Sequence, residues 1–243
     1  ECFCCPPNLV RTIARSAGWA YSLSENGISV NLYGGNELET SLRDGSRLAL
    51  TQETHYPWDG NVTLTLRACK EAPFELLLRI PDWADGANLL VNGTHANVEV
   101  APGTFARIER AWKPGDIVTL DLPMDIRLIE GHPRIEEVRN QAAIKRGPLV
   151  YCIESPDLPE GTGILDVYLL TGSELTAVHQ PDLLGGVTTV RGKIALRKDR
   201  GEGMYRVLGK PEWETVDGQF VPYYAWCNRG KSEMTVFAPL IWE

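Results

Sequence analysis

The feature that most constrains this chain is a succession of short segments in which apolar and polar residues alternate, each followed by residues that favour turns. A period of two predicts strands with one buried face, because successive side chains point to opposite sides of a sheet. Turn-forming pairs such as Asn92-Gly93, Pro102-Gly103 and Pro114-Gly115 separate the segments. Their even spacing predicts antiparallel β-sandwiches. The clearest strands of the first set cover residues 28–33, 47–54, 61–67, 74–80, 88–91, 104–112 and 116–122.

The alternation falls into two sets, which predicts two domains. The regular pattern breaks over residues 123–134, and a second set of strands begins near residue 142. We therefore predict a mainly β protein, with a first sandwich over residues 19–122 and a second over residues 123–220. The strongest strands of the second set cover residues 149–153, 187–196 and 220–226, with a loop at 155–163 and a charged hairpin tip at 197–203.

Composition argues against several classes of partner. The 243 residues carry a formal net charge of -8, and their lysines and arginines are scattered, so nucleic acid is not an expected partner. No apolar run has the length that spans a bilayer, so a membrane is not expected either. The six cysteines are unevenly spaced, which favours reduced thiols and a cytoplasmic protein over a disulfide framework. Because the chain opens at Glu1 within a cysteine motif, we expect a longer polypeptide, in which a targeting signal could precede this sequence.

One segment departs from the strand pattern and predicts a helix near the amino terminus. Its apolar residues recur at intervals of three and four, which places them on one helical face. Asn8 is the expected amino-terminal cap and Gly18 the expected stop. The apolar face consists of Leu9, Val10, Ile13, Ala14 and Ala17.

The cysteine cluster that precedes this helix, ECFCCPPN over residues 1–8, is the part of the sequence with chemical content. Unsatisfied amides at a helix start favour an anion, such as a thiolate at Cys4 or Cys5. Zinc takes four ligands in a tetrahedral shell, so two adjacent cysteines can share one ion only with partners from elsewhere. No further Cys or Cys/His pair follows at zinc-finger spacing. On these grounds a metal or reactive site and inert buried cysteines are about equally favoured.

The cluster, its helix and several later stretches resemble the β-L-arabinofuranosidases of glycoside hydrolase family 127, long classed as a domain of unknown function. The cluster contributes Cys4-Cys5-Pro6-Pro7-Asn8, followed by Arg11 in the helix. The resemblance covers nearly the whole chain, and the shared order of the stretches makes it specific. The later stretches are YPWDG at 56–60, LRIPDW at 78–83, VNG at 91–93, RAWKPGD at 110–116, HP at 132–133, RGPLVY at 146–151 and PYYAW at 222–226.

This resemblance implies a retaining glycosidase that releases β-L-arabinofuranose from plant-type glycans. By the family's motif, Cys4 is the nucleophile and a ligand of Zn²⁺, and Cys5 is a second zinc ligand. A glutamic acid protonates the leaving oxygen, and water then hydrolyses the thioglycosyl intermediate.

The resemblance also implies that the remaining site residues lie outside this sequence. The acid and the other zinc ligands belong to an upstream (α/α)6 barrel, of which residues 1–18 are the end. Neither Glu1 nor Cys2 takes an assigned role, so the chain alone is expected to lack activity. The family's architecture further suggests that residues 221–243 return to the first sandwich.

Two other functions stay open: a non-catalytic carbohydrate-binding module, and a structural module that braces a barrel or mediates a homodimer. Trp58, Trp83 and Trp112 could stack on sugar rings, but core or interdomain packing is favoured because each lies beside turn and strand residues. The four histidines are far apart and have no ligand spacing. An oligosaccharide or other glycoside is the expected substrate.

Overall fold

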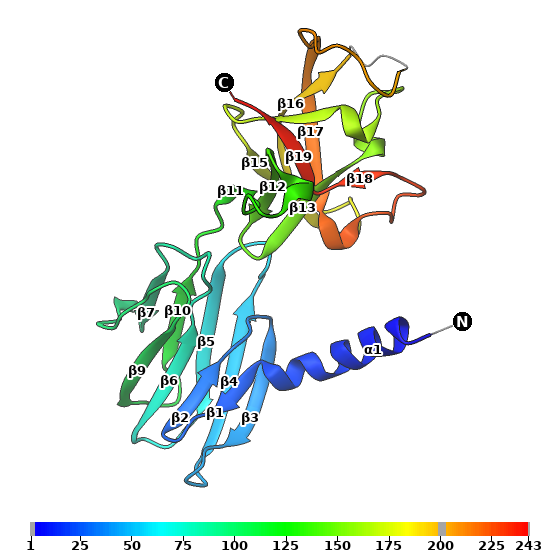
Figure 1. Cartoon of the computed structure of the whole chain (residues 1–243). Coiled ribbons are helices and arrows are strands. Elements are labelled where there is room, and N and C mark those ends of the chain that lie inside the picture. Colours follow the sequence, from blue (N-terminus) through cyan, green and yellow to red (C-terminus); the bar gives the residue numbers. More distant parts are fainter. Residues whose placement is uncertain (1–2, 199–202, 243) are drawn as a thin grey trace. The chain divides into compact units, whose positions relative to one another are not determined.

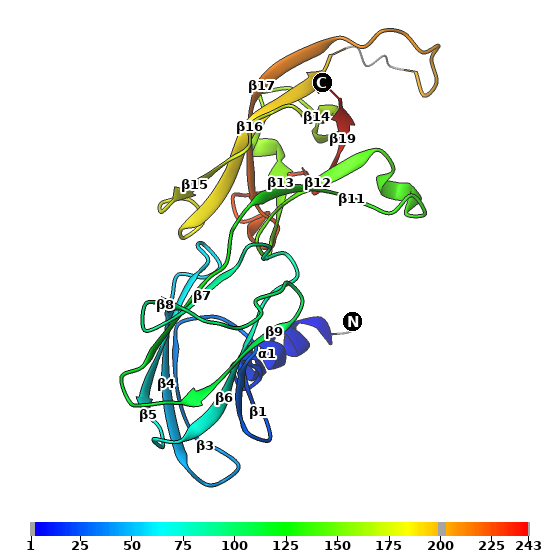
Figure 2. The ribbon, with the colours of Figure 1, turned by 90° about the vertical axis from the view of Figure 1, so that its left-hand side faces the viewer.

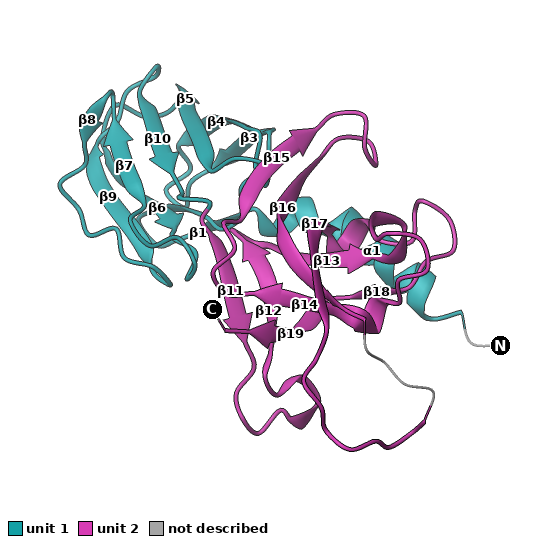
Figure 3. Cartoon of the chain, turned by 90° about the horizontal axis from the view of Figure 1, so that it is seen from above, with its two compact units in different colours: residues 1–124 teal, residues 125–243 magenta. Residues whose placement is uncertain are grey.

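Strands are the main secondary structure of the computed structural model, which describes residues 3–198 and 203–242 (Figure 1). The chain separates into two compact units, Glu1–Met124 and Asp125–Glu243, each with its own buried core (Figure 3). The prediction of a mainly β fold with a helix near the amino terminus is therefore confirmed. Within the described ranges, no helix combines the length and apolar character needed to cross a membrane.

In the described part of unit 1, two sheets pack face to face as a sandwich. One sheet has the order β1-β2-β6-β9, and the other β3-β4-β5-β10-β7-β8. Neighbouring strands are antiparallel except β2 and β6, which are parallel and therefore depart from the expected pattern. The strands are β1 Tyr21–Leu23, β2 Gly27–Val30, β3 Asn36–Ser41, β4 Arg47–Thr54, β5 Asn61–Ala68, β6 Pro73–Arg79, β7 Asn88–Val91, β8 Thr94–His95, β9 Phe105–Ala111 and β10 Ile117–Asp121.

The core of unit 1 follows directly from the alternation in the sequence. In β5, Val62, Leu64 and Leu66 are completely buried, whereas the residues between them are half-buried. The turn at Asn92-Gly93 joins β7 to β8 with φ of 50° and 77°, the left-handed conformation that a tight hairpin requires. The buried faces of the strands and the conformation of the turns together set the strand register, and the register determines which residues meet between the two sheets.

Trp112 is the largest completely buried side chain of unit 1. Its indole Nε1 donates a hydrogen bond to the carbonyl of Phe74 at 3.0 Å, and the guanidinium of Arg110 lies 5.2 Å from the ring centroid. The expectation of core packing for Trp112 is thus confirmed. Trp83 also packs against this core, and Trp58 is half-buried.

Replacing Trp112 with phenylalanine is expected to lower the free energy of unfolding of unit 1 by about 2 kcal/mol, because the smaller ring leaves a cavity and unpairs a carbonyl. Urea denaturation followed by hydrogen exchange of unit 1 peptides measures this loss. Trp19→Phe is the matched control, since Trp19 is 52% exposed and should change stability by less than about 0.5 kcal/mol. Equal effects at both sites would contradict the role given to Trp112.

Helix α1 spans Cys5–Ser16 and is followed by the 3-10 turn Ala17–Trp19. It begins three residues before Asn8, so the expected cap at Asn8 is wrong, and Cys4 occupies the cap position. Prolines explain the early start, because their fixed φ suits a first helical turn, where no N–H is needed. The helix ends before Gly18, which lies in the 3-10 turn. Along its described length, α1 has no buried residue; Leu9, Val10 and Ile13 are all more than 60% exposed.

Unit 2 is built around a sheet with the order β11-β12-β19-β14-β16-β17-β13-β18, while β15 pairs with β16. β12 also pairs with β13, so the path of strand pairings closes on itself around the second core. Figure 2 shows β16 and β17 side by side as a long pair. The strands are β11 Ile126–Glu130, β12 Gln141–Arg146, β13 Leu149–Glu154, β14 Val167–Leu170, β15 Thr176–Gln180, β16 Val187–Arg197, β17 Trp213–Pro222, β18 Met234–Thr235 and β19 Phe237–Ile241.

The last strands differ from the expectation. β18 pairs with β13, and β19 pairs antiparallel with β12 and parallel with β14, so residues 221–243 contribute to unit 2 and do not return to the first sandwich. The expected strand at 220–226 ends at Pro222, where the chain enters the 3-10 turn Tyr223–Ala225. Of the expected hairpin tip at 197–203, residues 199–202 lie outside the described part of the chain.

Candidate functional site

The adjacent thiols of Cys4 and Cys5 lie at the amino-terminal end of α1. Cys4 is the cap residue, with helical φ and ψ of −72° and −33°, and its carbonyl accepts the first helical hydrogen bond from the N–H of Asn8 at 3.1 Å. The two Sγ atoms are 3.9 Å apart, and both side chains are exposed. Both a metal or reactive site and inert cysteines therefore stay open for this pair, whose side chains are exposed in the described chain.

The spacing of the two sulfur atoms fits a shared tetrahedral metal ion. Zn–S bonds of about 2.3 Å at a tetrahedral angle separate two sulfur ligands by about 3.8 Å, and the observed distance is 3.9 Å. Within residues 3–198 and 203–242, no group of three His, Cys, Asp or Glu side chains could hold a metal ion. Glu1 and Cys2 lie outside the described residues. The pair thus fits one half of a zinc shell.

The start of α1 offers fewer free backbone amides than an ordinary helix start does. Pro6 and Pro7 have no N–H, and the N–H of Asn8 already bonds to Cys4, so only the amides of Cys4 and Cys5 remain at the start of α1. Asn8 contributes its side chain to the next turn, where Oδ1 accepts a hydrogen bond from Nη1 of Arg11 at 2.9 Å. Support for a thiolate from backbone donors is correspondingly small.

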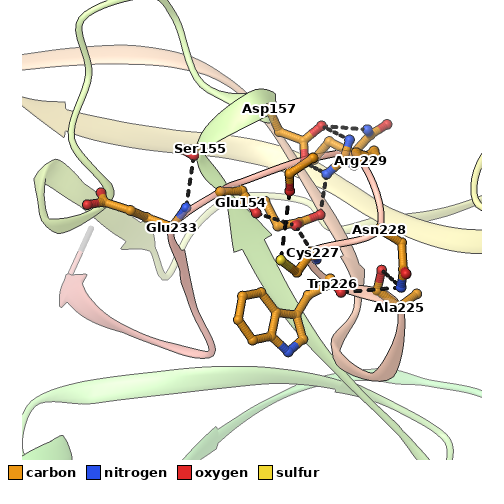
Figure 4. Close-up of polar contacts among 12 residues, drawn as sticks. Glu154, Ser155, Asp157, Ala225, Trp226, Cys227, Asn228, Arg229 and Glu233 are labelled. Carbon is orange, nitrogen blue, oxygen red and sulfur yellow. Dashed lines mark hydrogen bonds and ion pairs between the residues drawn. The ribbon is translucent and has the colours of Figure 1, made fainter.

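A second polar cluster lies in unit 2 at the end of β13 (Figure 4). The carboxylate of Glu154 is completely buried and accepts hydrogen bonds from the N–H of Cys227 at 2.8 Å and from Nη2 of Arg229 at 2.5 Å. Arg229 also donates through Nη1 and Nη2 to both carboxylate oxygens of Asp157, at 2.8 and 2.5 Å. Ser232 adds a hydroxyl donor to Glu154 at 2.9 Å. These bonds hold the loop after β17 against β13.

No role for this cluster was predicted from the sequence. Glu154 and Arg229 are 75 positions apart, so no local spacing connects them. The available signal was a glutamate at the end of the apolar stretch 149–153, because a charge beside buried strand residues generally needs a partner. The other isolated cysteine of this region, Cys152, is completely buried, and burial raises the pKa of its thiol to about 12.

The comparisons with known proteins agree over nearly the whole chain. Residues 27–124 match the profile described as "Beta-L-arabinofuranosidase, GH127 middle domain", and residues 126–239 match the "Glycoside hydrolase family 127 C-terminal domain". The chain belongs to glycoside hydrolase family 127. A non-reducing end β-L-arabinofuranosidase of Bifidobacterium longum subsp. longum is 33% identical over 248 residues, which cover 97% of this chain and 37% of that protein.

Solved structures of other proteins are also similar to this family 127 chain. A protein described as a glycoside hydrolase has a TM-score of 0.92 and 43% identity, with 99% of this chain and 40% of that chain covered. A GH127 β-L-arabinofuranosidase from Geobacillus stearothermophilus T6 has a TM-score of 0.90 and 36% identity, with 99% and 38% covered. The chain therefore spans about two-fifths of the length of these relatives and corresponds to their middle and carboxyl-terminal domains.

The buried carboxylate of Glu154 in this family 127 chain should make the stability of unit 2 depend on pH. Burial by itself would raise the pKa of Glu154, but hydrogen bonds from Cys227, Arg229 and Ser232 outweigh it and hold the pKa below the ordinary value of 4.5. A carboxyl with a lowered folded-state pKa stabilises the fold above its unfolded-state value and loses that contribution as pH falls through the folded-state value. Unit 2 is therefore expected to lose stability below about pH 4.5 through this group.

Glu154→Gln tests this prediction, because glutamine does not titrate. The variant should be less stable than the native protein at pH 7, and its stability should fall less between pH 6 and pH 3. Hydrogen exchange of unit 2 peptides at several pH values measures both effects. Parallel pH curves for the two proteins would show that Glu154 does not set the acid limit.

Proposed function

We propose that the complete polypeptide carrying this sequence is a retaining β-L-arabinofuranosidase in which the sulfur of Cys4 is the nucleophile. The observation that supports this most is the pair of exposed thiols, 3.9 Å apart, at the start of α1 in a family 127 chain. Two relatives are described as β-L-arabinofuranosidases, which suggests the sugar class. Cys4 and Cys5 would supply two ligands to Zn²⁺, and the other ligands would come from outside this chain.

The chemistry proposed for Cys4 is a double displacement. In the first step its thiolate forms a bond to the anomeric carbon while the bond from that carbon to the leaving oxygen breaks, and that oxygen takes a proton from a carboxylic acid outside this chain. In the second step water attacks the same carbon, the carbon–sulfur bond breaks, and the acid recovers its proton. Two inversions leave the configuration of the sugar unchanged.

The residues near Cys4 would position its sulfur for this reaction. Helix α1 holds both sulfur atoms on one backbone turn, and the fixed φ of Pro6 and Pro7 limits how far that turn can open. When bound, zinc would supply a positive charge that favours the thiolate form of its cysteine ligands. The exposed apolar face of α1 at Leu9, Val10 and Ile13 is consistent with a chain that has further protein packed on it in the complete polypeptide.

Hydrolysis of a chromogenic β-L-arabinofuranoside by the complete polypeptide tests the activity and the sugar class together. NMR of the first-formed product tests the stereochemistry, since a retaining enzyme releases the β anomer first. Metal analysis before and after treatment with a chelator tests the zinc. Absence of hydrolysis by metal-loaded protein would overturn the sugar assignment, and release of the α anomer would overturn the double displacement.

A further inference from the structure

Unit 2 contains a polar hollow of about 480 Å³ over the β16–β17 pair, a volume within the range of small-ligand pockets. All of its lining residues belong to unit 2, whereas Cys4 and Cys5 belong to unit 1. Asp157 forms part of its wall, so the hollow adjoins the buried cluster shown in Figure 4. Its lining consists of Asp157, Arg191, Gly192, Asp217, Gly218 and Gln219.

The strand register places the polar side chains on one face. Arg191 is paired with Gln219, Gly192 with Gly218, and Lys193 with Asp217. Alternate residues of β16, Val190 and Ile194, belong to the hydrophobic core, so Arg191 and Lys193 face away from it. An ion pair of 2.7 Å joins Lys193 Nζ to Asp217 Oδ1. Arg191, Gln219 and Asp217 therefore line the hollow from one face of the strand pair, and Lys193, outside the lining, pairs with Asp217.

The arginine and the glutamine are held in fixed orientations. Gln219 Oε1 accepts hydrogen bonds from Nε and Nη2 of Arg191 at 3.2 and 3.0 Å, and from Nε2 of Gln180 at 2.8 Å. Gln219 Nε2 donates to Oδ1 of Asp157 at 3.0 Å. The side chain of Asp157 is only 7% exposed and is bound at both oxygens by Arg229. The buried cluster thus acts as a support that positions the polar groups bordering the hollow.

The backbone of β16 and β17 at the hollow also makes close contacts on its other side. A Cβ atom added to Gly192 would lie 2.6 Å from Cδ2 of Leu175, and one added to Gly218 would lie 2.7 Å from Cγ2 of Ile194. A side chain at either position would therefore force Leu175 or Ile194 on the core-facing side to shift. The N–H of Lys193 also bonds to Oγ of Ser173 at 2.8 Å. These contacts support the strand pair on the side opposite the hollow.

The charges and hydrogen-bonding groups around the hollow indicate which class of ligand it could bind. The charged groups that line the hollow are Arg191, Asp157 and Asp217, and their ion-pair partners add Lys193 and Arg229 as positive groups and Glu154 as a negative group. Because the positive and negative groups balance, neither an anion nor a cation is favoured. Arg191 uses only Nε and Nη2 for Gln219, so its guanidinium keeps donors for a ligand, and the exposed carboxylate of Asp217 is an acceptor. A neutral molecule with several hydroxyl groups matches this arrangement.

We propose that this hollow is a saccharide-binding site that takes a neutral sugar residue without cleaving it. Arg191 donates to the sugar oxygens, and Asp217 accepts from the hydroxyl groups. The site would hold a glycan chain on unit 2 independently of the cysteine pair. The choice of an L-arabinose oligosaccharide as its ligand rests on the proposed function, whereas the preference for a neutral saccharide rests on the hollow itself.

The test is hydrogen exchange of the complete polypeptide, carrying Cys4→Ala to prevent turnover, with and without an L-arabinose trisaccharide. A trisaccharide of galacturonic acid serves as the charged comparison. We expect the arabinose oligosaccharide to slow exchange in peptides that cover 187–193 and 215–222, and Arg191→Ala to weaken this protection about tenfold in ligand concentration, as loss of a charged hydrogen-bond donor requires. Arg127→Ala is the control, since Arg127 is a partly exposed arginine on β11 that does not line the hollow.

The outcomes separate this site from the proposed hydrolase activity. Protection that is lost in Arg191→Ala and kept in Arg127→Ala supports the site, even if the native polypeptide proves inactive on arabinofuranosides. Protection that is absent, or equally strong in Arg191→Ala, overturns the site and leaves the hydrolase proposal untouched. Protection by the galacturonic acid trisaccharide instead overturns the preference for a neutral ligand. Circular dichroism of both variants excludes unfolding as the cause of a loss.

Discussion

Cys4→Ala is expected to lower hydrolysis of a β-L-arabinofuranoside by the complete polypeptide on the order of 10⁴-fold, because removing a covalent nucleophile removes the whole reaction path that depends on it. The thiol of Cys4 is exposed at the start of α1, so its loss creates no core cavity and the fold should persist. Kinetics on protein of matched metal content measure the effect. A variant that keeps full activity would return the cysteine pair to a structural role.

The neighbouring cysteine allows a sharper comparison. If Cys5 is only a metal ligand, Cys5→Ala should reduce bound zinc and activity together, and added zinc should restore part of the activity. Added zinc should not restore Cys4→Ala. Cys227→Ala is the control for loss of an exposed thiol, since Cys227 lies in unit 2. Equal kinetic losses in Cys4→Ala and Cys227→Ala would contradict a special role for Cys4.

Arg229→Met is expected to destabilise unit 2 by about 3–5 kcal/mol, the usual result of removing one partner from a buried ion pair. Methionine keeps much of the side-chain length but leaves the completely buried carboxylate of Glu154 and the nearly buried carboxylate of Asp157 without their cation. The loop that starts at Tyr223 also loses its attachment to β13. Urea denaturation followed by hydrogen exchange of unit 2 peptides measures the loss.

An exposed ion pair in the same unit is the matched control. Arg127 Nη2 lies 3.4 Å from Asp125 Oδ2, and the two side chains are 40% and 63% exposed. Arg127→Met should therefore change stability by less than about 1 kcal/mol. Glu154→Gln combined with Arg229→Met should cost less than the sum of the two single changes, because the second change removes the charge that the first leaves unpaired. Additive losses would show that the two residues do not act as a pair.

Local patterns predicted the parts of the fold that depend on neighbours in sequence. Alternation identified the buried face of β5 at Val62, Leu64 and Leu66, and the turn at Asn92-Gly93 follows from the backbone conformation that these residues tolerate. The start of α1 was placed too late because Asn8 is a good cap by residue type. Pro6 and Pro7 are equally good first-turn residues, and they moved the start to Cys5.

The pairing of strands that are far apart in the sequence could not be predicted from such local patterns. No periodicity in β19 indicates that it joins β12 and β14, or that β12 also pairs with β13 to close the sheet path of unit 2. The same limit applied to the sites. Cys4 and Cys5 are adjacent, so their motif could be recognised, whereas the link from Glu154 through Arg229 to Asp157 and Gln219 joins residues that meet only in the folded chain.

The most direct measurement of the role of Cys4 is mass spectrometry of the complete polypeptide quenched in acid during turnover of an activated β-L-arabinofuranoside. A double displacement through Cys4 predicts a fraction of the protein with one added anhydropentose, located after digestion on the peptide that contains Cys4 and absent from Cys4→Ala. A pentose found on another residue, or rapid turnover in which the first product is the inverted anomer and no adduct forms, would contradict the assignment of Cys4 as the nucleophile.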